Sequence, residues 1–477
     1  MRCVGIAGQH KEGSMSLPSH QRIVLIVTVI GLAAMASANN VLSQLGAFTA
    51  RDPGVRTGGA GAGGMLPNLS NLEQQVFGIG KEAFEEVASV QGTIPDTEAG
   101  LGPRFNLDSC AGCHAHPAIG GSSPAINPQL DVAKKAGAVN EVPSFIQKEG
   151  PIREVRFKFN PDGTPDGGVH ALFTITGRSD APGCFLAQPD FRSAVAAKNV
   201  VFRIPTPLFG AGLIEAIDDD TILANMRAMN STKQSLGIAG RVNSTSGRPN
   251  TSGNDGTVTR FGWKAQNKSL EMFSGEAYNV EQGVTSDLFP HERDEAPGCR
   301  YNGTPESPTN FGENRPLNVP SDVVKFAAFM RMLAAPTPAP DTDSIVRGRK
   351  LFNDVGCALC HTPTLQTGKS YIPALRDKDA NLYSDLVLHA MGPGLADDVG
   401  QGNARGDEFR TAPLWGLGKR TFFLHDGRTN DLLEAIRAHA SAANGTYPAS
   451  EANQVTARFN GLTEIDKQQV LNFLRSL

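Results

Sequence analysis

Two copies of the motif Cys-x-x-Cys-His constrain this chain more than any other feature of its sequence. They read Cys110-Ala-Gly-Cys113-His114 and Cys357-Ala-Leu-Cys360-His361. This spacing is the attachment signal for c-type haem, in which both thiols bond to the porphyrin and the histidine binds the iron. A zinc site usually pairs two Cys-x-x-Cys units, and a redox dithiol needs no histidine after it. The motifs therefore predict two covalently bound haem c groups, with His114 and His361 as iron ligands.

The composition of the whole chain argues against a nucleic-acid-binding protein. The 477 residues carry a formal net charge of −4 and no long basic run, so no nucleic-acid partner is expected. Gly (52) and Pro (31) are frequent, and aromatic residues make up only 6%. These proportions indicate much loop, with haem supplying part of the apolar bulk of the cores.

The N-terminal region has the pattern of an export signal. Arg22 precedes the apolar run 23–36, and Ala36-Ser37-Ala38 fits the small-x-small cleavage rule. The run is short for a membrane span, although an uncleaved anchor is the alternative. We expect residues 1–38 to be a signal peptide cleaved after Ala38, with Met15 as an alternative start, and the mature protein to be periplasmic.

Two cysteines remain outside the haem motifs once Cys3 is removed with the signal peptide. Cys184 and Cys299 each end the word Ala-Pro-Gly-Cys, and disulfides persist in exported proteins. We therefore predict a Cys184–Cys299 disulfide, which would contribute about 4 kcal/mol in the chain-entropy model because it closes a long loop. Two free buried thiols are the alternative.

The haem motifs suggest how the rest of the chain is organised. We predict a mainly α fold of two cytochrome c-like haem lobes, with a loop-rich, partly β insertion in the first lobe. A helix at 345–355 that runs into the second motif and a closing helix capped by Thr463 support this division. The predicted segments are a flexible linker at 39–69, an N-terminal haem lobe at 70–335 with its insertion at about 150–257, a Pro-rich linker at 336–342 and a C-terminal cytochrome c domain at 343–477.

Local patterns add a first helix and a weak internal repeat. Leu72, Val76 and Ile79 recur at 3- and 4-residue steps, which predicts an amphipathic helix with these residues on its apolar face. Farther on, the word Phe261-Gly-Trp263-Lys-Ala-Gln266, then Leu270, resembles Phe423-Leu-His425-Asp-Gly-Arg428, then Leu432. Each word lies well after its own haem motif, so the repeat agrees with two haem lobes.

Four words of the sequence carry a resemblance to a known family. They are Gly102-Pro-Arg-Phe-Asn-Leu-Asp-Ser-Cys110-Ala-Gly-Cys-His114, Arg260-Phe-Gly-Trp-Lys-Ala-Gln266, Tyr383-Ser-Asp-Leu-Val-Leu-His389-Ala-Met391-Gly-Pro-Gly-Leu and Arg410-Thr-Ala-Pro-Leu-Trp-Gly-Leu417. Over roughly residues 70–477 the chain resembles the di-haem c-type oxidoreductases, also called thiol oxidoreductases or named as peroxidases. More distantly it is similar to bacterial di-haem cytochrome c peroxidases. The resemblance implies one haem for electron transfer and one for chemistry at an open iron.

The group opposite each proximal histidine decides the role of its haem, because a second protein ligand favours electron transfer and an open position permits peroxide to bind. For the haem of His361 the candidates are His389, Met391, His425 and His439. In the di-haem peroxidases a His-x-Gly word lies fourteen residues before the axial methionine. Here that word begins at His425, and His439 is fourteen residues on. We predict ligation by His361 and His439, with Met391 as the alternative.

The haem of His114 has no evident distal histidine, so we predict an open or water-bound iron there. Splitting a peroxide needs a group that moves a proton between its oxygens. Aligned on the Trp263 word, Glu281 falls near the acidic residue of the bacterial peroxidases, and Gln266 is a weaker candidate; a surface glutamate is the alternative reading of Glu281. Trp263 resembles the tryptophan between the two haems of those enzymes and is predicted to relay electrons, unless it is simply a core residue.

These assignments predict a peroxidase that reduces hydrogen peroxide or another small oxidant at the first haem. Electrons would come from a small redox protein through the second haem, where Arg410 would bind a propionate because the guanidinium fork suits carboxylates. The alternatives are a di-haem oxidase or oxygenase of an organic or protein substrate, and an electron-transfer cytochrome c with both irons capped. Calcium lies between the lobes of some relatives, but no ligand cluster in this sequence is specific enough to predict it. The chain could form a homodimer.

Overall fold

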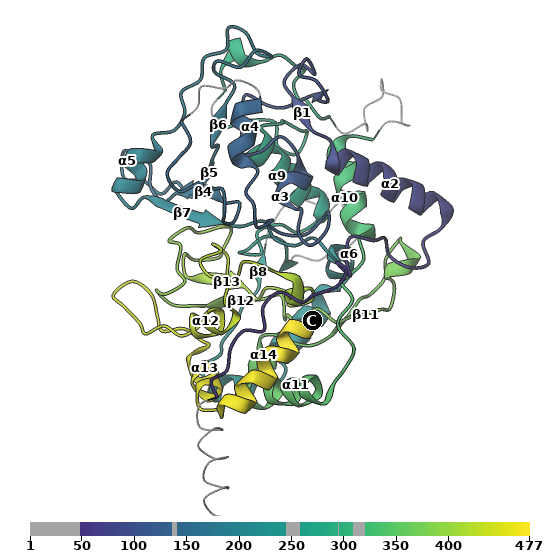
Figure 1. The fold of residues 1–477 in the computed structure, drawn as a ribbon, viewed down its shortest axis with the longest axis vertical. Coiled ribbons are helices and arrows are strands. Elements are labelled where there is room, and N and C mark those ends of the chain that lie inside the picture. Colours follow the sequence, from purple (N-terminus) through teal and green to yellow (C-terminus); the bar gives the residue numbers. More distant parts are fainter. Residues whose placement is uncertain (1–47, 136–140, 245–257, 294, 309–319) are drawn as a thin grey trace, which may run out of the picture. The chain divides into compact units, whose positions relative to one another are not determined.

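Two pairs of crossed helices frame the fold, one beside each Cys-x-x-Cys-His motif (Figure 1). The structure is a computed structural model that describes residues 48–135, 141–244, 258–293, 295–308 and 320–477. Helix α2 (Asn71–Glu85) packs on α10 (Asp322–Met332), and α11 (Asp343–Val355) packs on α14 (Glu464–Ser476). The last two agree with the helices predicted from sequence at 345–355 and after Thr463.

Each helix pair crosses at a glycine. A Cβ atom added to Gly80 of α2 would lie 2.5 Å from the carbonyl oxygen of Lys325 on α10. A Cβ atom added to Gly348 of α11 would clash with the carbonyl oxygen of Gln469 on α14. Both pairs therefore approach closely enough that only glycine fits at the crossing point.

A phenylalanine four residues after each of these glycines packs against the histidine of the neighbouring motif. The ring centroids of Phe84 and His114 lie 5.9 Å apart, and those of Phe352 and His361 lie 6.4 Å apart. The helix pairs thus reach the two motifs in the same way.

The crossing glycine of α2 gives a stability prediction with an internal control. Gly80→Ala is expected to lower the free energy of unfolding by about 1–3 kcal/mol, as other overpacking substitutions do. Gly78 lies in the same helix, and nothing lies within 4 Å of a Cβ atom built there. Gly78→Ala should therefore raise the free energy of unfolding by up to about 1 kcal/mol, the usual helix preference for Ala over Gly. Chemical denaturation of both variants measures the difference, and equal effects would contradict the close approach.

Capping side chains set where these helices begin. The Ser70 hydroxyl accepts from the Glu73 amide at 3.3 Å, and the Glu73 carboxylate accepts from the Ser70 amide at 2.7 Å, which is a capping box. The Thr463 hydroxyl accepts from the Asp466 amide at 3.1 Å, as the sequence predicts.

The buried face of α2 differs from the one predicted. Its buried residues are Phe77, Gly80 and Phe84, whereas Leu72 and Ile79 are 69% and 50% exposed. The helix is correctly predicted but its apolar stripe is not, because the close approach at Gly80 turns the neighbouring phenylalanines toward α10 instead.

The predicted partly β insertion contains a small antiparallel sheet. Its strands are β4 (Glu154–Phe157), β5 (Val169–His170) and β7 (Val200–Arg203), in the order β5-β4-β7. The register places Glu154 of β4 opposite Arg203 of β7. Because side chains alternate along a strand, Glu154 and Arg156 share one face of this sheet.

Cys184 and Cys299 form a disulfide with their Cα atoms 4.8 Å apart, across a sequence separation of 115 residues. Both cysteines are buried in the hydrophobic core that also contains Phe105, Phe173 and Leu172. The bridge therefore ties the insertion to the segment that follows α9 (Leu270–Gln282).

Apart from α9, the remaining elements are short. The helices are α3 (Cys110–Cys113), α4 (Gln129–Lys135), α5 (Phe191–Ala196), α6 (Ala211–Glu215), α7 (Asp219–Arg227), α8 (Asn230–Ser235), α9 (Leu270–Gln282), α12 (Leu432–Arg437) and α13 (Asn453–Asn460), with 3-10 turns at Pro297–Cys299, Cys357–Leu359, Pro373–Leu375 and Leu417–Lys419. The paired strands are β1 (Ala88–Ser89) with β2 (Glu98–Ala99), β3 (Arg104–Phe105) with β6 (Phe173–Thr174), β8 (Asn243–Ser244) with β9 (Val258–Thr259), β10 (Leu365–Gln366) with β11 (Asp379–Ala380), and β12 (Leu388–Ala390) with β13 (Glu408–Arg410).

Part of the predicted flexible linker is instead packed on the C-terminal helix. The Asp52 carboxylate forms an ion pair with Arg475 of α14 at 2.6 Å, and the Lys419 ammonium donates to the carbonyl oxygens of Arg56, Thr57 and Gly58. A Gly-rich composition suggested a free tether, but this backbone is held by charged side chains far along the sequence.

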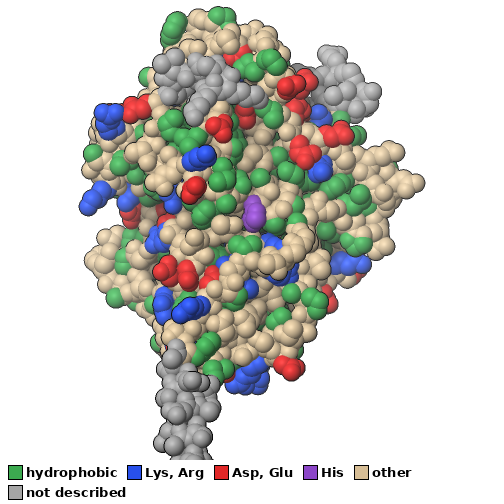
Figure 2. Space-filling view, in the orientation of Figure 1, with side chains coloured by type: hydrophobic (Ala, Val, Ile, Leu, Met, Phe, Trp, Pro, Cys, Tyr) green, Lys and Arg blue, Asp and Glu red, His purple; other side chains and the backbone are tan. Residues whose placement is uncertain are grey.

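The predicted signal peptide, residues 1–38, lies outside the described residues. Among the residues that the structure describes, no helix is both long and apolar enough to span a bilayer. The face shown in Figure 2 carries scattered acidic, basic and apolar side chains.

Candidate functional site

A cavity opens beside the first Cys-x-x-Cys-His motif. Cys110, Cys113 and His114 line it from α3, whose N-cap Ser109 accepts from the Gly112 amide at 3.1 Å. The Nδ1 atom of His114 lies 2.9 Å from the carbonyl oxygen of Gly121. An Nδ1–H donated to that oxygen fixes the tautomer whose Nε2 carries the lone pair, which is the usual arrangement for a histidine ligand of a metal.

A second cavity opens beside the second motif in the same manner. Cys357, Cys360 and His361 line it, and the Nδ1 atom of His361 lies 3.0 Å from the carbonyl oxygen of Tyr383. Burial lowers the pKa of both motif histidines to about 4. Each imidazole is therefore neutral near pH 7, as a metal ligand must be.

Both cavities fit a haem by their lining. Each surrounds the two cysteines and the histidine of its motif, with several aromatic and aliphatic side chains around them. Arg410 and Arg420 line the second cavity, and burial lowers the pKa of each to about 10. The Arg410 Nε donates to the Gly262 carbonyl oxygen at 3.0 Å, and among the described residues neither guanidinium pairs with a carboxylate. Two propionates would supply the missing partners.

The first cavity contains a pair of carboxyl groups. Glu281 of α9 and Glu154 of β4 both line it and hydrogen-bond to each other. The Asn106 amide donates to Glu281 Oε2 at 2.8 Å, and the Arg156 Nε donates to Glu154 Oε1 at 2.6 Å. The sequence singled out Glu281 alone, but the structure adds a carboxylate partner from the insertion.

The pair is arranged to hold a single proton. Burial, followed by the charge of Glu154, raises the pKa of Glu281 well above its usual range. Burial also opposes ionisation of Glu154, but Arg156 and Arg203 outweigh it and lower the pKa of that carboxyl. Near neutral pH, Glu154 is therefore the carboxylate and Glu281 the carboxylic acid, as expected when two acids share one site.

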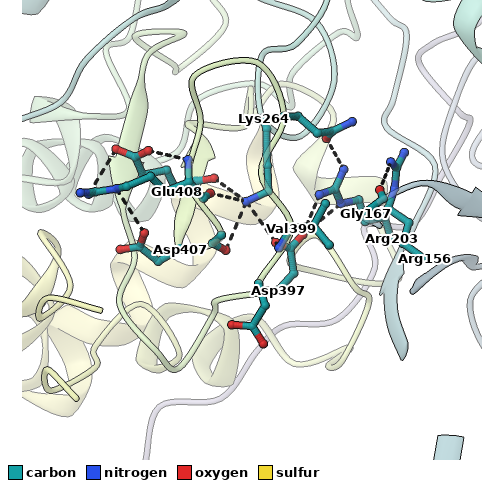
Figure 3. Close-up of polar contacts among 12 residues, drawn as sticks. Arg156, Gly167, Arg203, Lys264, Asp397, Val399, Asp407 and Glu408 are labelled. Carbon is teal, nitrogen blue, oxygen red and sulfur yellow. Dashed lines mark hydrogen bonds and ion pairs between the residues drawn. The ribbon is translucent and has the colours of Figure 1, made fainter. Parts of the chain in front are cut away.

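Arg203, which lies opposite Glu154 in the sheet, belongs to a buried ion-pair network that extends into the second half of the chain (Figure 3). Arg203 donates to Asp397 Oδ2 at 2.7 Å, and Asp397 Oδ1 lies 3.1 Å from the Lys264 ammonium. The ammonium also donates to the carbonyl oxygens of Arg405, Gly406 and Glu408 at 2.8–3.2 Å. Lys264 is fully buried, so the network fixes the backbone next to Trp263.

Trp263 is the residue that the two cavities share. It lines both of them, is 9% exposed, and donates its indole N–H to the Ile204 carbonyl oxygen at 2.9 Å. The ring centroids of Trp263 and His425 lie 6.4 Å apart in an edge-to-face arrangement, and His425 stacks on Phe409 with ring centroids 4.2 Å apart. Gln266 also lines the first cavity, and its Oε1 atom is buried without a hydrogen-bond partner.

All four candidates for the distal ligand of the second motif line the second cavity. His439 lines it with Nδ1 at 2.8 Å from the Ala435 carbonyl oxygen, which leaves Nε2 free. After burial, His439 is the next largest contribution to the lowered pKa of His361, so the two imidazoles lie close together. Met391 also lines this cavity and remains the alternative.

His425 and His389, the other two histidine candidates, also line the second cavity, and the ring of His425 stacks on Phe409. Both ring nitrogens of His389 face carboxylates, Glu451 at 2.7 Å and Asp385 at 3.0 Å. Cys360, Asp385 and His389 form the one cluster of potential metal-ligating side chains in the described part of the chain, but Cys360 belongs to the second Cys-x-x-Cys-His motif. His170 pairs with Asp166 at 2.7 Å, away from the lining of either cavity.

Sequence reasoning missed Glu154, Arg156, Arg203 and Arg420. The first two alternate along a single strand, Glu-Val-Arg-Phe, and that pattern was a usable signal. The other two gave no local signal, because their positions depend on the pairing of strands and loops that are distant in sequence.

Comparison with known proteins identifies the family. Residues 156–477 match the family model described as "Di-haem oxidoreductase, putative peroxidase". The match includes the second Cys-x-x-Cys-His motif, and the first motif lies upstream of it. Among curated protein sequences, none matches this chain.

Solved structures align with the chain at low identity. One is hydrazine synthase of Kuenenia stuttgartiensis, which is 14% identical over 90% of this chain and 98% of that one, with a TM-score of 0.35. Another is the dihaem peroxidase BthA from Burkholderia thailandensis, which is 14% identical over 46% of this chain and 65% of that one, with a TM-score of 0.29. A MauG-like protein associated with microbial copper homeostasis is 19% identical over 57% of this chain and 90% of that one, with a TM-score of 0.28. All three TM-scores lie below 0.5, and the family assignment stands on the sequence model.

Proposed function

The chain belongs to the di-haem oxidoreductase family, and from this premise we propose that it reduces a small peroxide in the first cavity with electrons that enter at the second. The two Cys-x-x-Cys-His motifs would attach haem c covalently, one in each cytochrome c-like lobe, with His114 and His361 on the irons. Bound haem would supply the redox-active iron at which the oxygen–oxygen bond of the peroxide breaks.

The observation that carries this proposal is the carboxyl pair of the first cavity. Reduction of hydrogen peroxide to two waters consumes two protons as well as two electrons. Glu281 holds a proton beside the cavity, and Glu154 keeps a carboxylate next to it. Glu281 can donate to the departing oxygen while the pair accepts the proton of the other oxygen, which is the general acid–base function expected of such a group. An electron carrier has no use for a proton-holding pair at this position.

The rest of the architecture suits electron delivery from the second cavity. His439 would complete a bis-His site there, which favours electron transfer over ligand binding. Trp263 lies between the cavities and contacts both, so it would relay electrons from one site to the other. The donor would be a small redox protein, and the export signal would place the reaction in the periplasm.

The test is a single-turnover reaction on the purified protein with both haems attached. The protein is reduced by one electron per chain, mixed with one equivalent of hydrogen peroxide and followed by haem absorbance. A rapid spectral change that reduced cytochrome c reverses is the expected result. A rapid change that such donors leave in place would favour oxidation of an organic or protein substrate instead. No change at all would mean that both irons are capped and would overturn the proposal.

A further inference from the structure

One loop beside each cavity has the same backbone conformation. Phe261 and Asn267 close the first loop as an antiparallel bridge, and Phe423 and Thr429 close the second with the same number of residues between them. The Phe261 amide donates to the Asn267 carbonyl oxygen at 3.0 Å, and the Phe423 amide donates to the Thr429 carbonyl oxygen at 2.9 Å. The weak sequence repeat noted above therefore corresponds to a structural one.

Positive φ angles occur at the same two positions of both loops. Gly262 has φ 84° where Leu424 has φ 67°, and Ala265 has φ 51° where Gly427 has φ 66°. A residue with a Cβ atom is destabilised by roughly 1–2 kcal/mol in this left-handed backbone conformation. Each loop nevertheless has one such residue there, Ala265 in the first and Leu424 in the second. The shared conformation is therefore a property of the fold and not of glycine placement.

The helix after each loop also begins at the same point. The Ser269 hydroxyl caps α9 by accepting from the Met272 amide at 3.2 Å. The Asp431 carboxylate caps α12 by accepting from the Glu434 amide, the matching residue, at 3.0 Å. The register between the two copies therefore continues without a shift into the helices.

The same positions after each loop line the two cavities. α9 presents Phe273, Ser274 and Ala277 to the first cavity, and the matching residues Ala435, Ile436 and His439 line the second. Ala435 and Ile436 belong to α12, and His439 lies in the turn that follows this helix, two residues beyond Arg437. In this register the counterpart of His439 is Ala277.

We propose that residues 261–277 and 423–439 are two copies of one ligand-presenting unit, and that Ala277 keeps the iron of the first cavity open because it stands where His439 stands in the second. The inference rests on the assignment of His439 as a distal ligand. It identifies Ala277 as the residue that leaves the first iron without such a ligand. Ala277 lies one helical turn before Glu281 on the same face of α9, so the space left by the missing imidazole is next to the Glu281 carboxyl.

Met330 is another side chain of the first cavity with an atom that could bind an iron, and Leu474, which lines the second cavity, has none. Met330 of α10 lines the first cavity, but its helix packs on Phe84, which contacts the proximal His114. In the second helix pair, Leu474 of α14 lines the second cavity. Met330 therefore belongs with the proximal packing and leaves the α9 side of the cavity open.

The experiment measures coordination, not turnover. In the oxidised protein with both haems attached, electron paramagnetic resonance should show one high-spin and one low-spin haem, and imidazole titration should show one binding event per chain. Ala277→His should remove the high-spin signal, give a second low-spin signal, and prevent imidazole binding at concentrations that saturate the unmodified protein. His439→Ala should have the opposite effect and add a second imidazole site.

Ser274→His is the matched control, since Ser274 lines the same cavity one turn earlier on α9 and its counterpart is Ile436. It should leave the high-spin signal unchanged. If Ala277→His fails to take up haem, the His439→Ala titration alone tests the register. The inference is overturned if the unmodified protein binds no imidazole, if Ser274→His and Ala277→His behave alike, or if His439→Ala adds no site. A protein that shows this ligation pattern but leaves peroxide unreduced would contradict only the proposed function.

Discussion

Glu281→Gln should slow peroxide reduction by about 100- to 10,000-fold, the range typical for loss of a general acid or base. Glutamine keeps the shape of the side chain and an oxygen to accept from Asn106, but it cannot hold the proton that the pair shares. Haem content and the resting spectrum should stay as they are, because Glu281 binds neither iron. Steady-state peroxide consumption with reduced cytochrome c as donor measures the effect.

Glu276→Gln is the matched control for this prediction. Glu276 lies on the same helix, lines the same cavity, and accepts from the side chains of Asn267 and Gln266. Among the described residues, Glu276 has no acidic partner in this cavity, so its replacement should slow peroxide reduction by less than about tenfold. Equal losses for Glu276→Gln and Glu281→Gln would mean that the cavity needs its overall negative charge rather than the proton of the pair.

The pH dependence of peroxide reduction by the Glu154→Gln variant tests directly whether Glu154 and Glu281 share one proton. After burial, the charge of Glu154 is the next cause that raises the pKa of Glu281. Without that charge, and with Arg156 left unpaired nearby, the pKa of Glu281 should fall. The acidic form of Glu281 would then be lost at a lower pH, so the alkaline limb of the peroxide rate profile should move to lower pH. An unchanged limb would show that the two carboxyls titrate independently.

The family could be predicted from sequence because its evidence is local. A Cys-x-x-Cys-His word fixes thiols and imidazole within one helical turn, so no knowledge of tertiary structure is needed to read it. Helix limits at 345–355 and after Thr463 were similarly local, because caps and periodicity set them. The strand pattern Glu-Val-Arg-Phe is a local signal for Glu154, but its pairing with Glu281 could not be found in this way, since Glu281 comes from a helix more than a hundred residues away.

The buried face of α2 shows why periodicity alone was insufficient. Leu72, Val76 and Ile79 form one stripe at helical spacing, and Phe77, Gly80 and Phe84 form a second. Hydrophobicity favours the first stripe, in which no residue is a glycine. The structure buries the second stripe because α2 and α10 can pack closely only where a residue without a side chain, Gly80, lies at their crossing point.

The internal repeat was understated by the sequence for a related reason. The two loops need left-handed backbone at two positions, and each loop places its glycine at a different one of them, Gly262 in the first and Gly427 in the second. A comparison of letters therefore finds mismatches at both positions, although the conformations agree. Backbone geometry makes the correspondence of Ala277 with His439 visible where residue identity does not.

His439→Met should raise the reduction potential of the second haem by on the order of 100 mV or more, within the roughly 0.8 V range that axial ligands span. A thioether ligand stabilises the reduced iron relative to imidazole. The substitution should keep the site six-coordinate and low-spin, because Met reaches about as far as His. Spectroelectrochemical titration of the purified protein measures the potential, and the potential of the first haem should move little.

Met391→Leu is the reciprocal measurement, since Met391 lines the same cavity and is the alternative ligand. If His439 binds the iron, Met391→Leu changes neither the spin state nor the potential by more than a small fraction of the His439→Met effect. If Met391 binds it, Met391→Leu opens the iron, and His439→Met leaves the potential where it was. The second outcome would also remove the basis for matching Ala277 to a distal ligand, because the position of His439 would then carry no ligand in either half of the chain.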